Sequence, residues 1–214
     1  MDLVDHSGGL LIRGADHAWT LCFIDVYTAW TECVAVRNKA QVHVFEAILR
    51  ARGCLPFPFL GVDSDNGSEF INNQLVRYCK CEPITFTRGR VGNKNDNAYA
   101  EQKNWSVVRR VAGYLRYDTL EQLALLNRLY AAVHYYANFF LPVMKLASKS
   151  RVGSRVMRVY DRPQTPYARV LASPQVTDEH KELLRETYQL LDLVDLRQQV
   201  SDLLDALFRS ASTP

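Results

Sequence analysis

Val62-Asp-Ser-Asp-Asn-Gly-Ser-Glu-Phe70 is the stretch that decides the fold class, and its partner is Asn97-Ala-Tyr-Ala-Glu-Gln-Lys-Asn104. In the first stretch an apolar strand ends at Asp65, and the turn residues Asn66-Gly67-Ser68 follow at once. The second stretch opens a helix that carries Glu101 in its first turn. Open α/β sheets place their ligand sites at the carboxyl ends of strands. The sequence therefore predicts an acidic site at the edge of such a sheet.

The pattern on either side of these stretches predicts an α/β fold with a helical extension. Runs of β-branched and aromatic residues predict strands around residues 3–4, 19–26, 31–36, 55–65 and 84–87. Apolar residues at helical spacing predict helices over residues 40–52, 69–81, 98–117 and 120–140. This order favours a mixed central sheet flanked by helices.

The last third of the chain differs in character from the first two. After Pro142 the periodicity gives way to a basic stretch, and two amphipathic helices over 179–191 and 195–208 close the chain. We therefore expect three parts, an α/β core over residues 1–141, a basic segment over 142–175 and a helical tail over 176–214. The tail helices are suited to pairing between protomers and equally to packing on the chain's own core.

Composition excludes several classes of protein. The 214 residues are 48% hydrophobic and 23% charged, which is ordinary for a soluble globular protein. No apolar run approaches the ~18 residues that a membrane span needs, and no export signal opens the chain. The five cysteines form no metal-type pairs, which favours reduced thiols and a cytoplasmic location.

Charge is unevenly distributed although the net charge is only +3. Between Lys145 and Arg169 there are seven basic residues and one acid, Asp161. Such segregation indicates a basic strip that can bind a polyanion, although charge alone fits a solvated loop equally well.

Three acids carry the candidate chemistry: Asp2, Asp65 and Glu101. Each alone is a common cap or helix-dipole partner. Together, on two strands and a helix, they offer the oxygen ligands that Mg²⁺ or Mn²⁺ prefers. Two such ions, ~3.5–4 Å apart, can act on both the attacking and the leaving oxygen of a phosphodiester. Without metal the clustered carboxylates would repel one another, so the trio would be a poor structural device.

The stretches Val62–Phe70 and Asn97–Asn104 resemble the retroviral-integrase-type catalytic core of bacterial insertion-sequence transposases. Residues 66–100, thirty-five in number, separate Asp65 from Glu101, which is the spacing that many members of that family have. Further similar stretches are Asp2–Gly9, Phe23–Glu32, Tyr136–Pro142 and Gln164–Pro166, so the resemblance covers roughly residues 2–170. It implies a ribonuclease H-like catalytic core over residues 1–141, followed by a DNA-contacting basic segment. It also implies an Asp, Asp, Glu triad that binds metal and that cuts and joins DNA strands without a protein nucleophile.

Some choices among the acids remain open from sequence. Asp2 and Asp5 have opposite parity on a strand, so only one of them faces the site, and the resemblance favours Asp2. It also favours Asp65 over Asp63. Asp25 stands before a turn, where a capping role is expected.

The chain departs from the family pattern in two places. The loop Arg90-Val-Gly-Asn-Lys94 lacks the Pro-Tyr pair expected there. The chain also begins on the first catalytic strand, whereas such transposases carry an N-terminal helix-turn-helix. We therefore expect a fragment, a truncated reading frame or half of a split protein.

The expected partners are element ends and target DNA, bound by a homo-oligomer. The basic residues expected to contact phosphates lie before the catalytic helix, on it, and in the basic strip: Arg88, Arg90, Lys94, Lys103, Arg109, Lys149, Arg151 and Arg155. Two other hypotheses remain. One is a ribonuclease H-like nuclease that does not join strands, and the other is a truncated, transposase-derived DNA-binding or assembly module.

Overall fold

A computed structural model describes residues 1–9, 16–65, 67, 69–70, 73–90 and 102–211. Its strands form an antiparallel sheet in the order β1-β2-β3 and a parallel pair, β4-β5. Their bounds are β1 Asp2–Asp5, β2 Trp19–Ile24, β3 Thr31–Val36, β4 Gly61–Ser64 and β5 Thr85–Arg88. The α/β class is confirmed.

The central sheet is divided where one mixed sheet was expected. β1 and β4 are joined by a hydrogen bond of 2.7 Å from the Met1 amino group to the Asp63 carbonyl, and the described ladders do not continue between them. The strand expected over 55–65 begins only at Gly61. Pro56 and Pro58 lack the N–H groups that a ladder needs, which explains why β4 is short.

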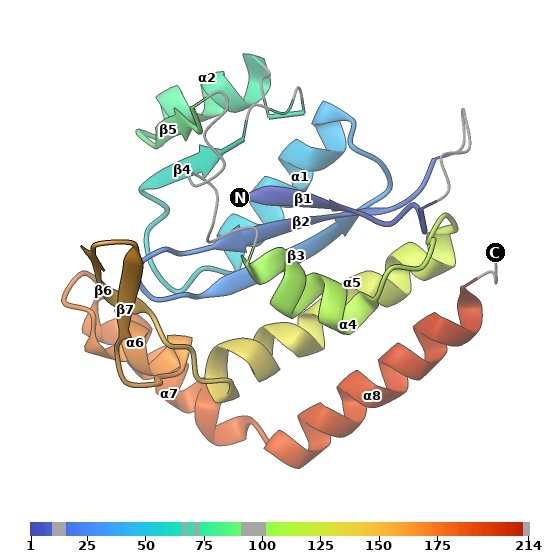
Figure 1. Ribbon diagram of the computed structural model, residues 1–214. Coiled ribbons are helices and arrows are strands. Elements are labelled where there is room, and N and C mark those ends of the chain that lie inside the picture. Colours follow the sequence, from blue (N-terminus) through green and yellow to red (C-terminus); the bar gives the residue numbers. More distant parts are fainter. Residues whose placement is uncertain (10–15, 66, 68, 71–72, 91–101, 212–214) are drawn as a thin grey trace.

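Helices cover both faces of the antiparallel sheet (Figure 1). Side chains alternate between the faces, so Leu21 and Val34 face α1 (Gln41–Gly53) and α2 (Asn73–Cys81). Cys22 and Ala35 face the opposite way, toward the core formed by three further helices. These are η1 (Asn104–Arg109, π-helical), α4 (Arg110–Ala112) and α5 (Leu120–Tyr135), which continues as the π-helix η2 (Tyr136–Phe140).

α5 is anchored at its start and along its length. Thr119 and Gln122 form a capping box that satisfies the first backbone N–H groups. Further along, the amides of Asn127 and Asn138 bond the backbone of β3 at Ala35 and Thr31. The helix predicted over 120–140 is thereby confirmed.

The helix predicted over 98–117 ends earlier in the structure. Its described part ends at Ala112, because Gly113 adopts a positive φ of 71°. The chain then runs back to the sheet, where the Tyr117 N–H donates to the His6 carbonyl at 3.2 Å and the Tyr117 carbonyl accepts from Ala18 at 2.6 Å. These contacts bury Tyr117 in the core.

Beyond Phe140 the basic segment is folded, which the sequence pattern did not predict. It forms an antiparallel hairpin, β6 (Leu146–Val152) and β7 (Arg155–Tyr160), followed by α6 (Pro166–Ala172). Two helices then close the chain, α7 (Asp178–Leu190) and α8 (Leu193–Ser210). Both match the predicted tail helices within three residues.

α8 lies along the chain's own core instead of extending away from it (Figure 1). Leu203 and Leu207 are buried against the α5 side of the core, so packing on the chain itself is the alternative that the structure shows. Among the described residues, no helix has both the length and the apolar character that a membrane span requires.

Leu207→Ala is expected to destabilise the fold by about 2–5 kcal/mol, because it leaves a cavity under a fully buried side chain. Leu190→Ala, at a side chain that is 87% exposed, should change stability by less than about 0.5 kcal/mol. Urea unfolding followed by circular dichroism measures both. Equal effects would contradict the placement of α8 on the core.

Candidate active site

Asp2 stands on the face of β1 that the helices η1 and α5 cover. Asp2 and Val4 are two residues apart on the strand, so their side chains share one face, and Val4 belongs to the core on that side. The Asp2 carboxylate is half-buried, and each of its oxygens accepts a hydrogen bond. Oδ1 accepts from the Leu3 backbone N–H at 2.8 Å, and Oδ2 accepts from Nδ2 of Asn104 at 2.7 Å.

Asp65 lies close enough to Asp2 to affect its charge. It directly follows β4, and its Oδ1 accepts a hydrogen bond from the Gly67 N–H at 3.0 Å. Burial raises the pKa of Asp2, and the negative charge of Asp65 raises it further, against the hydrogen bonds from Leu3 and Asn104. The hydrogen bond from the Met1 amino group to the Asp63 carbonyl places the start of β1 beside the end of β4, so Asp2 and Asp65 lie on neighbouring segments.

Glu101, the third predicted acid, lies outside the described residues. The helix that follows it does reach the site, since Asn104 comes three residues later and holds the Asp2 carboxylate. Sequence reasoning missed Asn104. The signal was its spacing, because residues three apart on a helix share one face.

The pair of acids fits a divalent cation. Two carboxylates with a raised pKa on one of them are oxygen ligands whose mutual repulsion a cation would relieve. Oδ1 of Asn104 is buried without a hydrogen-bond partner among the described residues, which leaves one more oxygen at the site. Among the described residues there is no cluster of three His, Cys, Asp or Glu side chains that could hold a metal.

The competing acids have other partners. Asp5 Oδ1 lies 2.7 Å from His17 Nε2, and Asp5 Oδ2 accepts from the Ser7 hydroxyl at 2.7 Å. Asp63 accepts from the Thr87 hydroxyl at 2.6 Å. Asp25 accepts from both the N–H and the hydroxyl of Thr28, each at 2.6 Å, which confirms its predicted capping role.

The predicted phosphate-contacting residues differ in how exposed their side chains are. Arg88, Arg90, Lys149, Arg151 and Arg155 are exposed, and Arg109 is half-buried with its guanidinium over the Tyr114 ring. Lys94 lies outside the described residues. Lys103 departs from expectation, because it is only 8% exposed and burial lowers its pKa. It faces the Cys22 and Cys33 side of the core, so its ammonium is not presented to a phosphate in this structure.

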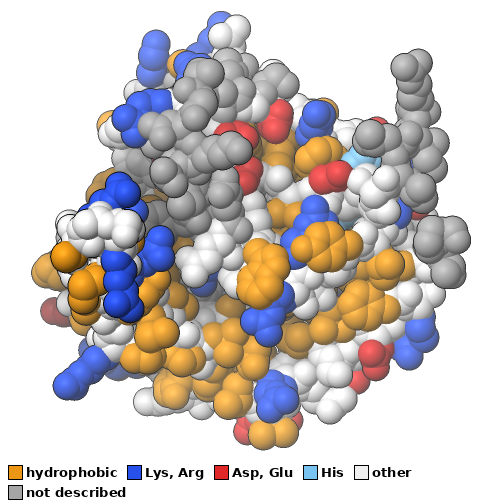
Figure 2. Space-filling view, in the orientation of Figure 1, with side chains coloured by type: hydrophobic (Ala, Val, Ile, Leu, Met, Phe, Trp, Pro, Cys, Tyr) orange, Lys and Arg blue, Asp and Glu red, His pale blue; other side chains and the backbone are white. Residues whose placement is uncertain are grey.

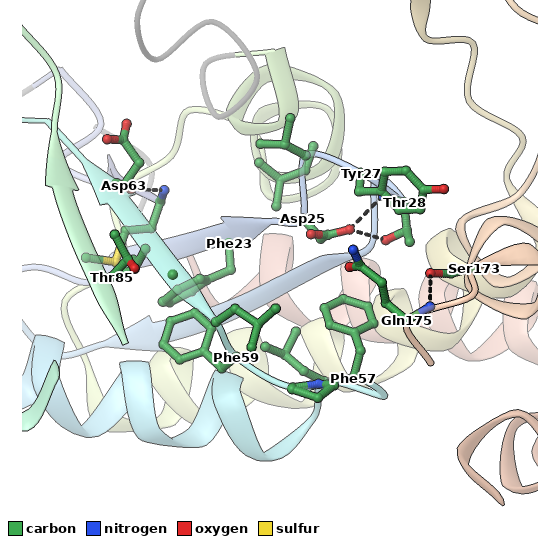
Figure 3. Close-up of a pocket in the computed structure, with 18 of the residues that line it drawn as sticks. Phe23, Asp25, Tyr27, Thr28, Phe57, Phe59, Asp63, Thr85, Ser173 and Gln175 are labelled. Atoms are coloured by element: carbon green, nitrogen blue, oxygen red, sulfur yellow. Dashed lines mark hydrogen bonds between the residues drawn. The ribbon is translucent and has the colours of Figure 1, made fainter. Parts of the chain in front are cut away.

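A separate pocket of about 390 Å³ lies beside β4 (Figure 3). Its walls are largely aromatic and aliphatic, with Phe23, Phe57 and Phe59 on one side and the Asp25–Thr28 turn on another. Asp63 borders it, whereas Asp2 and Asp65 do not. The cavity is therefore distinct from the acidic site.

Asp2→Asn is expected to stabilise the metal-free protein at pH 7. A carboxyl whose pKa is raised by folding binds its proton more tightly in the native state, so its contribution to stability falls as pH rises above the usual value near 3.8. The amide removes that loss, and Asn104 can turn its side chain to keep a hydrogen bond. Thermal melts at pH 7 and pH 3 measure the change.

The gain in melting temperature should be present at pH 7 and absent at pH 3. Asp63→Asn, an exposed acid on β4, is the matched control and should show no gain at either pH. An Asp2→Asn protein less stable than wild type at pH 7 would contradict this account of the Asp2 environment.

No family model matches the chain. Over 169 residues, 79% of this chain, it is 43% identical to the uncharacterised protein y4rM of Sinorhizobium fredii, and the match covers 48% of that protein. The chain thus spans about half the length of this curated relative.

Structural neighbours include retroviral integrase catalytic core domains at low sequence identity. The BIV integrase core is 16% identical with a TM-score of 0.47, over 85% of this chain and 96% of that one. The HTLV-2 integrase core, solved in complex with magnesium, is 14% identical with a TM-score of 0.42, over 60% and 77%. A chain from the simian T-cell lymphotropic virus intasome is 12% identical with a TM-score of 0.47, over 69% and 62%.

Proposed function

We propose that this chain is the catalytic part of a metal-dependent DNA transposase or integrase with a ribonuclease H-like core. The observation that carries the proposal is that Asn104, on the helix that follows Glu101, holds the Asp2 carboxylate at 2.7 Å while Met1 bonds the end of the strand that Asp65 follows. The thirty-five residues between Asp65 and Glu101 support it from the sequence. Asp2, Asp65 and Glu101 are the metal-binding and catalytic residues of the proposal.

Each residue has a distinct task in the proposed site. Asp2, Asp65 and Glu101 would hold Mg²⁺ or Mn²⁺ ions, which when bound supply an activated water and charge stabilisation at the reacting phosphate. Asn104 fixes the orientation of the Asp2 carboxylate, and the Gly67 N–H fixes that of Asp65. Because these hydrogen bonds preset the carboxylates, little reorganisation is needed when a cation and a phosphate arrive.

The proposed reaction has two steps that need no covalent protein intermediate. In the first, water attacks a phosphodiester at the element end, the P–O3′ bond breaks, and a proton passes to the leaving 3′ oxygen. In the second, that 3′-hydroxyl attacks a phosphodiester of target DNA, forming one P–O bond while one breaks. DNA is therefore both substrate and partner, and a homo-oligomer that holds paired ends is part of the proposal.

Glu101→Gln should reduce both cleavage and joining by about 100-fold or more, because the amide lacks the charge that metal binding requires. Gel assays with a labelled terminal-repeat duplex and Mg²⁺ or Mn²⁺ measure cleavage, and a pre-cut end measures joining. Glu121→Gln, in the first turn of α5, is the matched control and should keep both activities.

The outcomes separate the alternatives. Joining at wild-type level in Glu101→Gln would reject the assignment of Glu101. Cleavage without joining in the wild type would identify a nuclease, and DNA binding without either step would identify an assembly module.

Asp65→Asn should weaken divalent-cation binding by about tenfold or more, because it removes one of the carboxylates that the proposal assigns to the metal. Isothermal titration with Mn²⁺ measures the affinity directly, independent of any DNA substrate. Asp25→Asn is the control acid, since Asp25 caps a turn and should leave the affinity unchanged. Equal affinities for wild type and Asp65→Asn would overturn the metal site.

A further inference from the structure

The β6–β7 hairpin is a two-stranded ribbon with all of its residues exposed. Residues 146–160 include Lys149, Arg151, Arg155 and Arg158 but no acid. An isolated two-stranded hairpin is marginally stable in water, so a ribbon of this kind gains from a partner. Figure 2 shows its basic side chains on the same face of the molecule as acidic side chains near the start of β1.

The register of the strands divides the basic residues between the two faces of the ribbon. Lys149 lies opposite Arg158, and Arg151 lies opposite Val156, so Lys149, Arg151 and Arg158 share one face. Arg155 lies opposite Val152, on the other face, which also carries Met157 and Val159. The ribbon therefore has a cationic face and a mainly apolar one.

The cationic face costs stability in the free protein. Like charges directly opposite each other on neighbouring strands are destabilising, and Lys149 and Arg158 are such a pair. A row of phosphates along this face would turn that repulsion into attraction. The pairing thus favours a polyanionic partner.

The base of the ribbon is fixed to the rest of the chain. Asp161, the one acid between Lys145 and Arg169, forms an ion pair with Arg169 at 2.8 Å and accepts from the Lys145 N–H at 2.6 Å. Arg169 also donates to the Val143 carbonyl at 2.9 Å. Arg169 holds the pKa of Asp161 below its usual range. Asp161 is therefore paired with Arg169 at the foot of the hairpin, and it does not offset the positive charges of Lys149, Arg151 and Arg158.

We propose that β6–β7 is a DNA arm that lays its cationic face, Lys149, Arg151 and Arg158, into the major groove of duplex DNA and contacts the bordering phosphates. The major groove is about 12 Å wide and admits a two-stranded ribbon. Arg155 faces away from the duplex and makes no phosphate contact. This inference rests on the proposed function, because it takes DNA as the partner.

The test compares Arg158→Ala with Arg155→Ala in the full chain. Both residues are exposed arginines of β7, so the two variants remove the same charge from opposite faces. Fluorescence anisotropy with a labelled 30-base-pair duplex in EDTA gives the affinity between 50 and 200 mM salt. Arg158→Ala should flatten the slope of log K against log salt by about one unit, whereas Arg155→Ala should leave it unchanged.

Rescue by Arg158→Lys, which restores the charge, should return the slope to the wild-type value. Equal slopes for Arg158→Ala and Arg155→Ala, whether both flattened or both unchanged, would contradict the proposal that one face of the hairpin contacts DNA. Because EDTA excludes metal chemistry, binding and catalysis are tested separately. If only Arg158→Ala flattens the slope and the wild type does not cleave DNA, the proposed function is rejected and the DNA-contacting hairpin stands. If the wild type cleaves DNA and the two variants have equal slopes, only the DNA-contacting hairpin is rejected.

Discussion

Two side-chain amides on one helix fix the register on which the rest of the fold depends. Asn127 exchanges two hydrogen bonds with the backbone of Ala35, and Asn138 does the same with Thr31. Buried peptide groups at the outer edge of β3 must be bonded, so α5 and η2 can sit against the sheet in one position. In that position His134 meets the buried Glu32 at 2.8 Å, and η1 lies over β1. Asn104 reaches Asp2 as a result.

The ionised Asp2 carboxylate is electrostatically unfavourable in the folded protein. Burial and the charge of Asp65 both disfavour the charged form of Asp2 and raise its pKa, whereas hydrogen bonds from Leu3 and Asn104 and the positive charge of the Met1 amino group oppose them. A structural role would be served better by an amide or a hydroxyl at that position. The arrangement suits the proposed cation, because the hydrogen-bonded carboxylates would already be oriented and their repulsion would be relieved on binding.

Sequence reasoning succeeded where local chemistry decides the structure and failed where distant contacts do. The helix over 120–140 could be predicted because Thr119 and a stripe of leucines mark it, and the turn at Asp25 because its acid precedes Thr28. The division of the sheet was not predicted, because whether β4 pairs with β1 depends on how distant segments meet, which no local pattern reveals. Lys103 was expected at the surface, but its position relative to Cys22 is set by the packing of η1. Glu101 is outside the described residues, so its role rests on spacing and resemblance.

The exposed ribbon has a consequence for the protein in solution. Its strands present open edges, and such edges invite pairing with the same segment of another molecule, which is a route to aggregation. Lys149, Arg151 and Arg158 act as gatekeepers, since two copies that approach edge to edge bring like charges together. Ionic strength weakens this protection, because charges are screened over about 10 Å at 0.1 M salt. The residues that we propose to contact DNA would therefore also keep free molecules from pairing edge to edge.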